Sequence, residues 1–227
     1  MTAQTPPLSL RPFDAVIFDM DGTILDTESV FRTIVFEVCT ELGFEMTDAV
    51  HISMVGGSHE KTNQLLIEAY GVAFPYTLFD ERCRVIMRER SAGGVPVKRG
   101  AREFITELHR RGIPVAVATS SRKAHAHHHL AEAGLLALFD TVVTRDDVVH
   151  PKPDPEPYLL AAQRLGIDPL LCLAIEDSHA GVRAAHAAGM QTVMVPDLVH
   201  PDESLLALEI AVVESLDHVH LAAFRDR

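Results

Sequence analysis

The stretch Ala15-Val-Ile-Phe-Asp19-Met-Asp21-Gly-Thr23 decides the fold. Its first four residues are continuously apolar, which is typical of a parallel strand buried on both faces. Two carboxylates follow where this strand would end. In an open α/β sheet, ligands bind at the carboxyl ends of the strands. We therefore expect Asp19 and Asp21 to stand at a functional site.

Further short apolar runs continue this pattern along the chain. They lie at 114–118, 141–143, 171–175 and 191–195, with a final short run at 211–213 that predicts an edge strand. Segments with helical character lie between them, at 100–111, 122–133, 155–165 and 179–188. Alternating strands and helices at this spacing predict an α/β fold with a doubly wound parallel sheet.

One region interrupts the alternation. About 90 residues without a convincing strand separate the first apolar run from the second, far more than an ordinary crossover needs. Segments 28–42, 58–70 and 77–90 have helical apolar spacing instead. We interpret residues 28–96 as an α-helical cap domain inserted into a catalytic core formed by residues 1–27 and 97–227.

Composition limits the possible functions. The chain has 227 residues, 47% of them hydrophobic, and a formal charge of −12. Such a charge predicts no nucleic-acid partner and no anionic membrane surface. Three widely spaced cysteines, no secretory signal and no apolar run of about 18 residues predict a reduced, cytoplasmic protein. A small anionic substrate stays possible if a metal ion and a few cations make the site locally positive.

Polar residues follow each of the first four predicted strands. Asp19 and Asp21 follow the first strand, Thr119, Ser120 and Ser121 the second, Lys152 the third after a short loop, and Glu176 and Asp177 the fourth. Two carboxylate pairs, a hydroxyl cluster and a lysine would thus meet at one edge of the sheet. Their combination, rather than any single pair, predicts a catalytic site.

The residue types suit phosphoryl transfer. Mg²⁺ prefers carboxylate and carbonyl oxygens, which Asp19, Asp177 and the backbone of Asp21 could supply. A carboxylate is ionised at neutral pH, so Asp19 can attack phosphorus and form an aspartyl-phosphate. Asp21 can protonate the leaving oxygen and later activate water. Thr119, the Ser120 N–H and the Lys152 ammonium can bind the phosphoryl oxygens.

These motifs resemble those of the haloacid dehalogenase (HAD) superfamily in order and spacing, over nearly the whole chain. They are Asp19-Met-Asp21-Gly-Thr23, Thr119, Lys152 in Lys-Pro-Asp-Pro-Glu, and Glu176-Asp177-Ser-His-Ala-Gly181. The inserted helices resemble the cap of the subfamily that includes β-phosphoglucomutase. The resemblance implies a Rossmann-like core, a mobile cap and Mg²⁺-dependent phosphoryl transfer. It also implies that Glu176 and Asp177 form the metal end of the site.

The cap departs from the mutase pattern. Phe31 stands where the mutase has a histidine, and Val55 and His59 stand where it has a lysine and an arginine. Since those groups hold the second phosphate of the mutase, their loss favours a phosphatase acting on a small phosphorylated metabolite such as a sugar phosphate. In the loop around 55–61, Ser58, His59 and Lys61 are candidates for contacting the leaving group.

Several residues keep a second interpretation. Thr119 could cap the next helix, and Thr27 could contact substrate or cap the first cap helix. His59 could be a solvent-exposed loop residue. His125 and His129 lie four residues apart, a spacing that can chelate a metal, but a solvated helix surface is the simpler interpretation of the histidine cluster at 125–129.

Three alternative functions stay open at this point. They are a sugar-phosphate mutase, a phosphoreceiver-type signalling protein, which would lack the helical insert and the Glu-Asp pair, and a catalytically idle binding protein. We expect a monomer or a weak homodimer.

Overall fold

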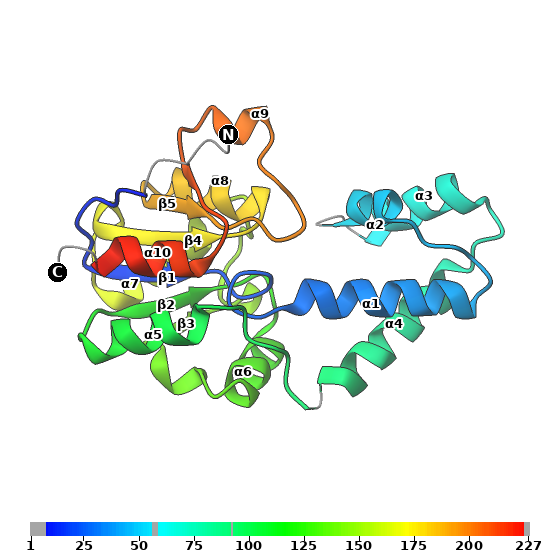
Figure 1. Cartoon of the computed structure of the whole chain (residues 1–227), viewed down its shortest axis with the longest axis horizontal. Coiled ribbons are helices and arrows are strands. Elements are labelled where there is room, and N and C mark those ends of the chain that lie inside the picture. The colour runs from blue at the N-terminus through cyan, green and yellow to red at the C-terminus, as the bar shows by residue number, and fades with distance from the viewer. Residues whose placement is uncertain (1–7, 56–58, 92, 225–227) are drawn as a thin grey trace, which may run out of the picture. The chain divides into compact units, whose positions relative to one another are not determined.

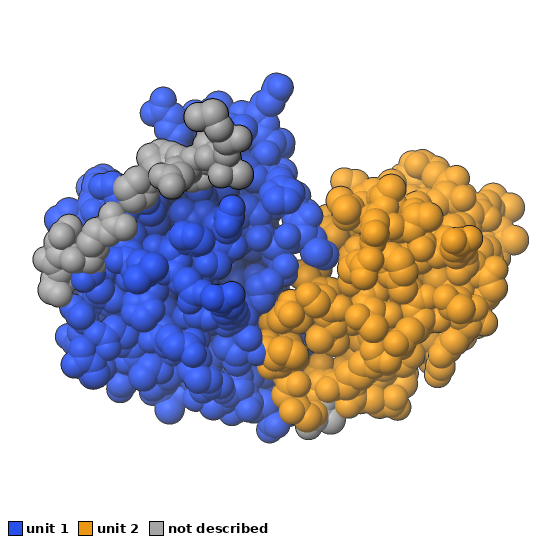
Figure 2. Space-filling model, viewed as in Figure 1, with its two compact units in different colours: residues 1–25, 97–227 blue, residues 26–96 orange. Residues whose placement is uncertain are grey.

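A computed structural model describes residues 8–55, 59–91 and 93–224. The chain separates into two compact units, one made of residues 1–25 and 97–227 and the other of residues 26–96 (Figure 2). The helical cap expected at 28–96 lies inside the second unit, which begins two residues earlier, at Asp26. Among the described helices, none is both long and apolar enough to cross a membrane.

The described residues of the first unit are built on one six-stranded parallel sheet (Figure 1). Its strands are β1 (Ala15–Phe18), β2 (Val115–Ala118), β3 (Thr141–Val143), β4 (Cys172–Glu176), β5 (Gln191–Met194) and β6 (Ala211–Val212). They lie in the order β3-β2-β1-β4-β5-β6. β2 and β3 therefore lie on one side of β1, and β4, β5 and β6 lie on the other. This order confirms the predicted doubly wound α/β fold, and the strand boundaries agree with the predicted ones to within a residue.

Helices cover both faces of this sheet, which explains why the central strands are apolar without alternation. On one face, α7 (Glu156–Leu165) and α8 (His179–Ala187) share a buried cluster with Ile17 and Ala116. On the other, α5 (Ala101–Arg110) brings Phe104 against Phe18, with ring centroids 5.6 Å apart. The remaining elements of the unit are α6 (Lys123–Glu132), α9 (Glu203–Leu206), α10 (Leu216–Phe224) and the short 3₁₀ turns at 136–138, 145–147 and 169–171.

The second unit contains four helices in its described residues. These are α1 (Thr27–Glu41), α2 (Asp48–Met54), α3 (His59–Tyr70) and α4 (Tyr76–Ser91). Ile34, Val38 and Leu66 belong to a buried cluster of their own, closed by the aromatic rings of Phe74 and Phe79. The unit therefore has a core separate from that of the sheet.

Candidate active site

Two adjacent strands bring three carboxylates together. β1 and β4 pair with Phe18 opposite Ile175, and the Asp19 N–H donates to the Ile175 carbonyl at 2.9 Å. Because Asp19 follows β1 and Glu176 ends β4, their side chains leave the same edge of the sheet. One carboxylate oxygen from each of Asp19, Glu176 and Asp177 lies within 4.8 Å of the others.

The Lys152 ammonium binds two of these carboxylates. Its Nζ lies 2.6 Å from Oδ1 of Asp19 and 2.6 Å from Oε1 of Glu176. The lysine side chain is only 4% exposed, although Lys152 belongs to a loop between β3 and α7. Buried charges are tolerated only when they are paired. The Lys152 ammonium therefore serves the carboxylates of the site and does not contact solvent as an ordinary surface lysine would.

Glu176 is fully buried and both of its oxygens are already occupied. Oε1 accepts hydrogen bonds from Lys152 and from the Tyr158 hydroxyl at 2.9 Å. Oε2 accepts from the backbone N–H groups of Asp177 and Ser178, both at 3.0 Å, and from the Ser178 hydroxyl at 2.9 Å. Because both oxygens already accept hydrogen bonds, Glu176 is better suited to orienting Lys152 than to binding a metal ion directly.

Two hydroxyl groups surround the carboxylate of Asp21. The Ser121 hydroxyl donates to Oδ2 of Asp21 at 2.7 Å, and the Thr119 hydroxyl lies 3.4 Å from the same oxygen. Thr119 Oγ1 also accepts from the Ser121 N–H at 3.0 Å. Thr119 does not cap α6, because the N-cap position of that helix is Arg122. The alternative of a helix cap is therefore wrong for Thr119.

The electrostatic balance of the site is unusual. Burial, together with the charges of Glu176 and Asp21, raises the pKa of Asp19 to about 8 against the attraction of Lys152. The pKa of Lys152 is also raised, because the two carboxylates outweigh the effect of its burial. Two buried carboxylates, Asp19 and Glu176, thus share one lysine, with Asp21 adding negative charge nearby. A further cation close to Asp19 would favour its ionised, nucleophilic form.

The donor set fits a divalent metal ion. Hard oxygen ligands from Asp19 and Asp177 at the strand ends are what Mg²⁺ prefers. Gly22 leaves room for this arrangement, since a Cβ there would lie 2.2 Å from Oδ2 of Asp177, and its φ of +85° also favours glycine. A buried acidic cluster of this kind agrees with the divalent metal that HAD phosphatases typically use.

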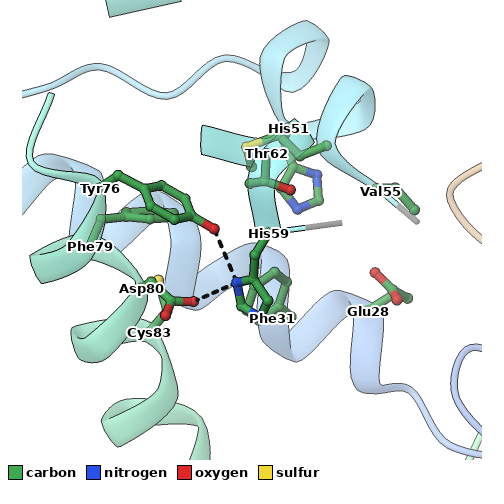
Figure 3. A pocket seen from close by; sticks show the side chains of 11 residues that line it. Glu28, Phe31, His51, Val55, His59, Thr62, Tyr76, Phe79, Asp80 and Cys83 are labelled. Atoms are coloured by element: carbon green, nitrogen blue, oxygen red, sulfur yellow. Dashed lines mark hydrogen bonds and ion pairs between the residues drawn. The ribbon is translucent and has the colours of Figure 1, made fainter. Parts of the chain in front are cut away.

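A cavity of about 210 Å³ lies within the second unit (Figure 3). Glu28 and Phe31 of α1, His59 and Thr62 of α3, and Tyr76 and Asp80 of α4 are among its lining residues. Nδ1 of His59 lies 3.1 Å from the Tyr76 hydroxyl and 3.4 Å from Oδ1 of Asp80, as the dashed lines show. His59 thus belongs to a hydrogen-bonded wall of this cap pocket.

The other predicted site residues differ in their surroundings. Ser120 is exposed, whereas its neighbour Ser121 contacts Asp21. Thr27 is buried, and among the described residues its hydroxyl has no hydrogen-bond partner. The N-cap of α1 is Asp26, so the alternative of a helix cap is wrong for Thr27. Ser58 lies outside the described residues.

Sequence reasoning missed Tyr158 at the site and assigned no role of its own to Ser121. Tyr158 lies in the first turn of α7, where nothing in the sequence marks it as more than a core aromatic residue. Ser121 belongs to the predicted hydroxyl cluster, but the sequence does not show which serine of the turn faces Asp21.

The histidine cluster is not a solvated surface throughout. His129 is 1% exposed, and its Nε2 lies 2.6 Å from Nε2 of the exposed His125. Two nitrogens bound to one Zn²⁺ ion at about 2.1 Å in tetrahedral geometry would lie roughly 3.4 Å apart. The observed distance is that of a hydrogen bond between the rings, and the interpretation of His129 as solvated is wrong.

Comparison with known proteins agrees with this geometry. The family model described as haloacid dehalogenase-like hydrolase matches residues 13–189. The chain belongs to this family.

Individual relatives are similar over most of their length. The fructose-1-phosphate phosphatase YqaB of Escherichia coli (strain K12) is 37% identical over 186 residues, which cover 81% of this chain and 96% of that protein. A HAD family hydrolase of Deinococcus radiodurans, solved with bound phosphate and sodium, is 30% identical with a TM-score of 0.80, covering 92% and 93% of the two chains. The β-phosphoglucomutase of Clostridium difficile, 22% identical with a TM-score of 0.68 over 91% and 93%, shares the fold. The predicted resemblance to HAD hydrolases is confirmed.

Proposed function

We propose that this chain is a Mg²⁺-dependent phosphatase of a small phosphorylated metabolite, with a sugar phosphate as the preferred class of substrate. The observation that carries the proposal is the buried Lys152 ammonium, 2.6 Å from Oδ1 of Asp19, within a cluster of three carboxylates. A relative named fructose-1-phosphate phosphatase supports a sugar phosphate as the class of substrate.

The side chains divide the reaction between them. An oxygen of Asp19 attacks phosphorus while the bond from phosphorus to the leaving oxygen breaks, and Asp21 donates a proton to that oxygen. Asp21 then accepts a proton from the water that hydrolyses the aspartyl-phosphate. Lys152, Thr119 and the Ser120 N–H bind the phosphoryl oxygens.

A bound Mg²⁺ would offset the charge of the phosphate dianion. We propose Asp19, Asp177 and the backbone carbonyl of Asp21 as its protein ligands. Glu176 remains a candidate from the sequence, but its hydrogen bonds favour a role in orienting Lys152.

A sugar-phosphate mutase is the second candidate, because its fold is the same. A mutase must hold a second phosphate group, which requires cations. The described residues that line the cap pocket include the carboxylates of Glu28 and Asp80 but no lysine or arginine. Together with Phe31, this lining favours hydrolysis.

The deciding experiment measures phosphate release from sugar phosphates, nucleotides and an aryl phosphate, with Mg²⁺ or EDTA. We expect Mg²⁺-dependent release by the wild type and a loss of at least about a thousandfold in Asp19→Asn, because an amide is a poor nucleophile. Asp14→Asn, the same change at an exposed position before β1, is the matched control and should keep full turnover.

Two results would contradict the proposal. Substantial turnover by a folded Asp19→Asn protein would remove Asp19 as the nucleophile. Isomerisation of a sugar 1-phosphate that is accelerated by a bisphosphate, without net phosphate release, would establish the mutase instead. The cytoplasmic location and the monomeric or weakly dimeric state stay predictions; the three free, buried cysteines agree with a reduced protein.

A further inference from the structure

A row of hydrogen bonds leads from Asp21 into the first turns of α6. The Ser121 hydroxyl lies 2.7 Å from Oδ2 of Asp21, and Nδ1 of His125 lies 3.4 Å from the Ser121 oxygen. His125 and His129 then approach through their Nε2 atoms at 2.6 Å. The proposed function uses Asp21 but assigns no role to these three side chains.

The direction of these bonds follows from counting hydrogens. A neutral imidazole has one N–H and one acceptor nitrogen. Burial lowers the pKa of His129 to about 4, so this ring is neutral at neutral pH. Its Nδ1 is buried and has no hydrogen-bond partner within the part of the chain that the structure describes. A buried N–H without an acceptor is rarer in proteins than an unused acceptor, so the hydrogen belongs on Nε2 of His129.

Every later bond then has one direction. His129 donates from Nε2 to Nε2 of His125, which leaves the hydrogen of a neutral His125 on Nδ1. That N–H points to the Ser121 oxygen, and the single hydroxyl hydrogen of Ser121 points to Oδ2 of Asp21. The two rings therefore keep the serine hydroxyl available as a donor to the carboxylate.

We propose that Ser121 is a positioning residue that holds the Asp21 carboxylate for proton transfer, and that His125 and His129 orient Ser121. This proposal rests on the proposed function, in which Asp21 exchanges protons with the leaving oxygen and with water. A fixed carboxylate needs less reorganisation when the proton moves.

The first test compares Ser121→Ala with Ser121→Thr on two substrates with saturating Mg²⁺ at pH 8. A sugar phosphate has a poor leaving group and needs the proton from Asp21, whereas p-nitrophenyl phosphate has a good one and depends on it less. We expect Ser121→Ala to lower kcat/KM for the sugar phosphate about tenfold and for the aryl phosphate about twofold or less. Ser121→Thr keeps the hydroxyl and should restore most of the loss.

The second test is a double-mutant cycle. His125→Ala should lower kcat/KM for the sugar phosphate about threefold in the wild-type background and not at all in Ser121→Ala, because His125 acts through the serine. His127→Ala, a histidine of the same helix outside this row of bonds, is the matched control and should leave kcat/KM unchanged. Additive effects of Ser121→Ala and His125→Ala, equal losses on both substrates, or a rise in KM alone would overturn the proposal.

A third measurement does not depend on catalysis. Histidine ¹⁵N shifts, assigned with the single variants, should show the Nε2–H tautomer for His129 and the Nδ1–H tautomer for His125. The opposite tautomers would overturn the proposed direction of the bonds. If the wild type hydrolyses no phosphate ester at all, the proposed function fails. The tautomers of His125 and His129 still test the proposed direction of the hydrogen bonds in that case.

Discussion

Glu176 shows how a single buried residue can organise the site. Its carboxylate is fully buried and accepts hydrogen bonds from Lys152, Tyr158, Ser178 and two backbone N–H groups. An ionised group in such surroundings is stable only while all of these donors stay in place. The position of the Lys152 ammonium beside Asp19 therefore depends on the fit around Glu176.

Gly181 provides the test of that fit. A Cβ at Gly181 would lie 1.6 Å from Oε1 of Glu176, so Gly181→Ala must displace the carboxylate. We expect a loss of about 2 kcal/mol in the free energy of unfolding by urea and a clear fall in kcat. Gly93→Ala is the matched control, because no described atom outside its chain neighbours lies within 4 Å of a Cβ there. Wild-type stability and turnover in Gly181→Ala would show that Glu176 has room to move.

The buried His129 ring should make the stability of the protein depend on pH. Burial holds its pKa at about 4 in the folded protein, against about 6.5 when unfolded. Between these values the unfolded chain binds more protons, so stability falls as the pH falls from about 7 and levels off near 4.

The expected result is a shallower loss of Tm between pH 7.5 and pH 5 in His129→Gln than in the wild type. The His127→Gln control should follow the wild-type profile. Parallel profiles for the wild type and His129→Gln would mean that the His129 ring titrates normally in the folded protein.

At the scale of elements, the start of α8 links local folding to the site. Ser178 is the N-cap, and its hydroxyl accepts from the Gly181 N–H at 3.1 Å and donates to Oε2 of Glu176 at 2.9 Å. Thr47 caps α2 in the same manner, with its hydroxyl 3.3 Å from the Val50 nitrogen, but lies in the other unit.

Both caps should therefore matter for stability and only one for catalysis. We expect Ser178→Ala and Thr47→Ala each to lower the free energy of unfolding by about 1 kcal/mol. Only Ser178→Ala should also lower kcat, because it removes a donor from Glu176. Urea unfolding and steady-state kinetics on both variants check this, and an equal effect on kcat would contradict it.

At the scale of the whole molecule, Mg²⁺ should stabilise the fold. An ion that binds only the folded chain adds about 2.7 kcal/mol at 100 times its Kd, which corresponds to a rise in Tm of roughly 5–10 °C for a chain of this size. The rise should vanish in Asp177→Asn and persist in Glu103→Gln, an exposed carboxylate on α5. A Tm that does not respond to Mg²⁺, or responds equally in both variants, would contradict binding at Asp177.

The elements that the sequence left out are short or lie outside the strand-helix rhythm. α2 has seven residues and α9 has four, too few for helical periodicity to show. α10 follows the last strand and packs against α5, where Phe224 meets Phe104 with ring centroids 5.9 Å apart. Their helical form depends on packing against the rest of the unit.

The sequence by itself determined the sheet, its order of functional motifs and the family, because buried parallel strands are continuously apolar and the candidate catalytic residues follow them along the chain. Only the tertiary structure decided that Ser121 rather than Ser120 contacts Asp21, that Tyr158 donates to Glu176, and that His129 is buried. The physical reason is that strand periodicity and motif spacing are properties of the chain. The direction of a side chain in a turn, or the buried side of a helix such as α6, is set by the elements that pack around it.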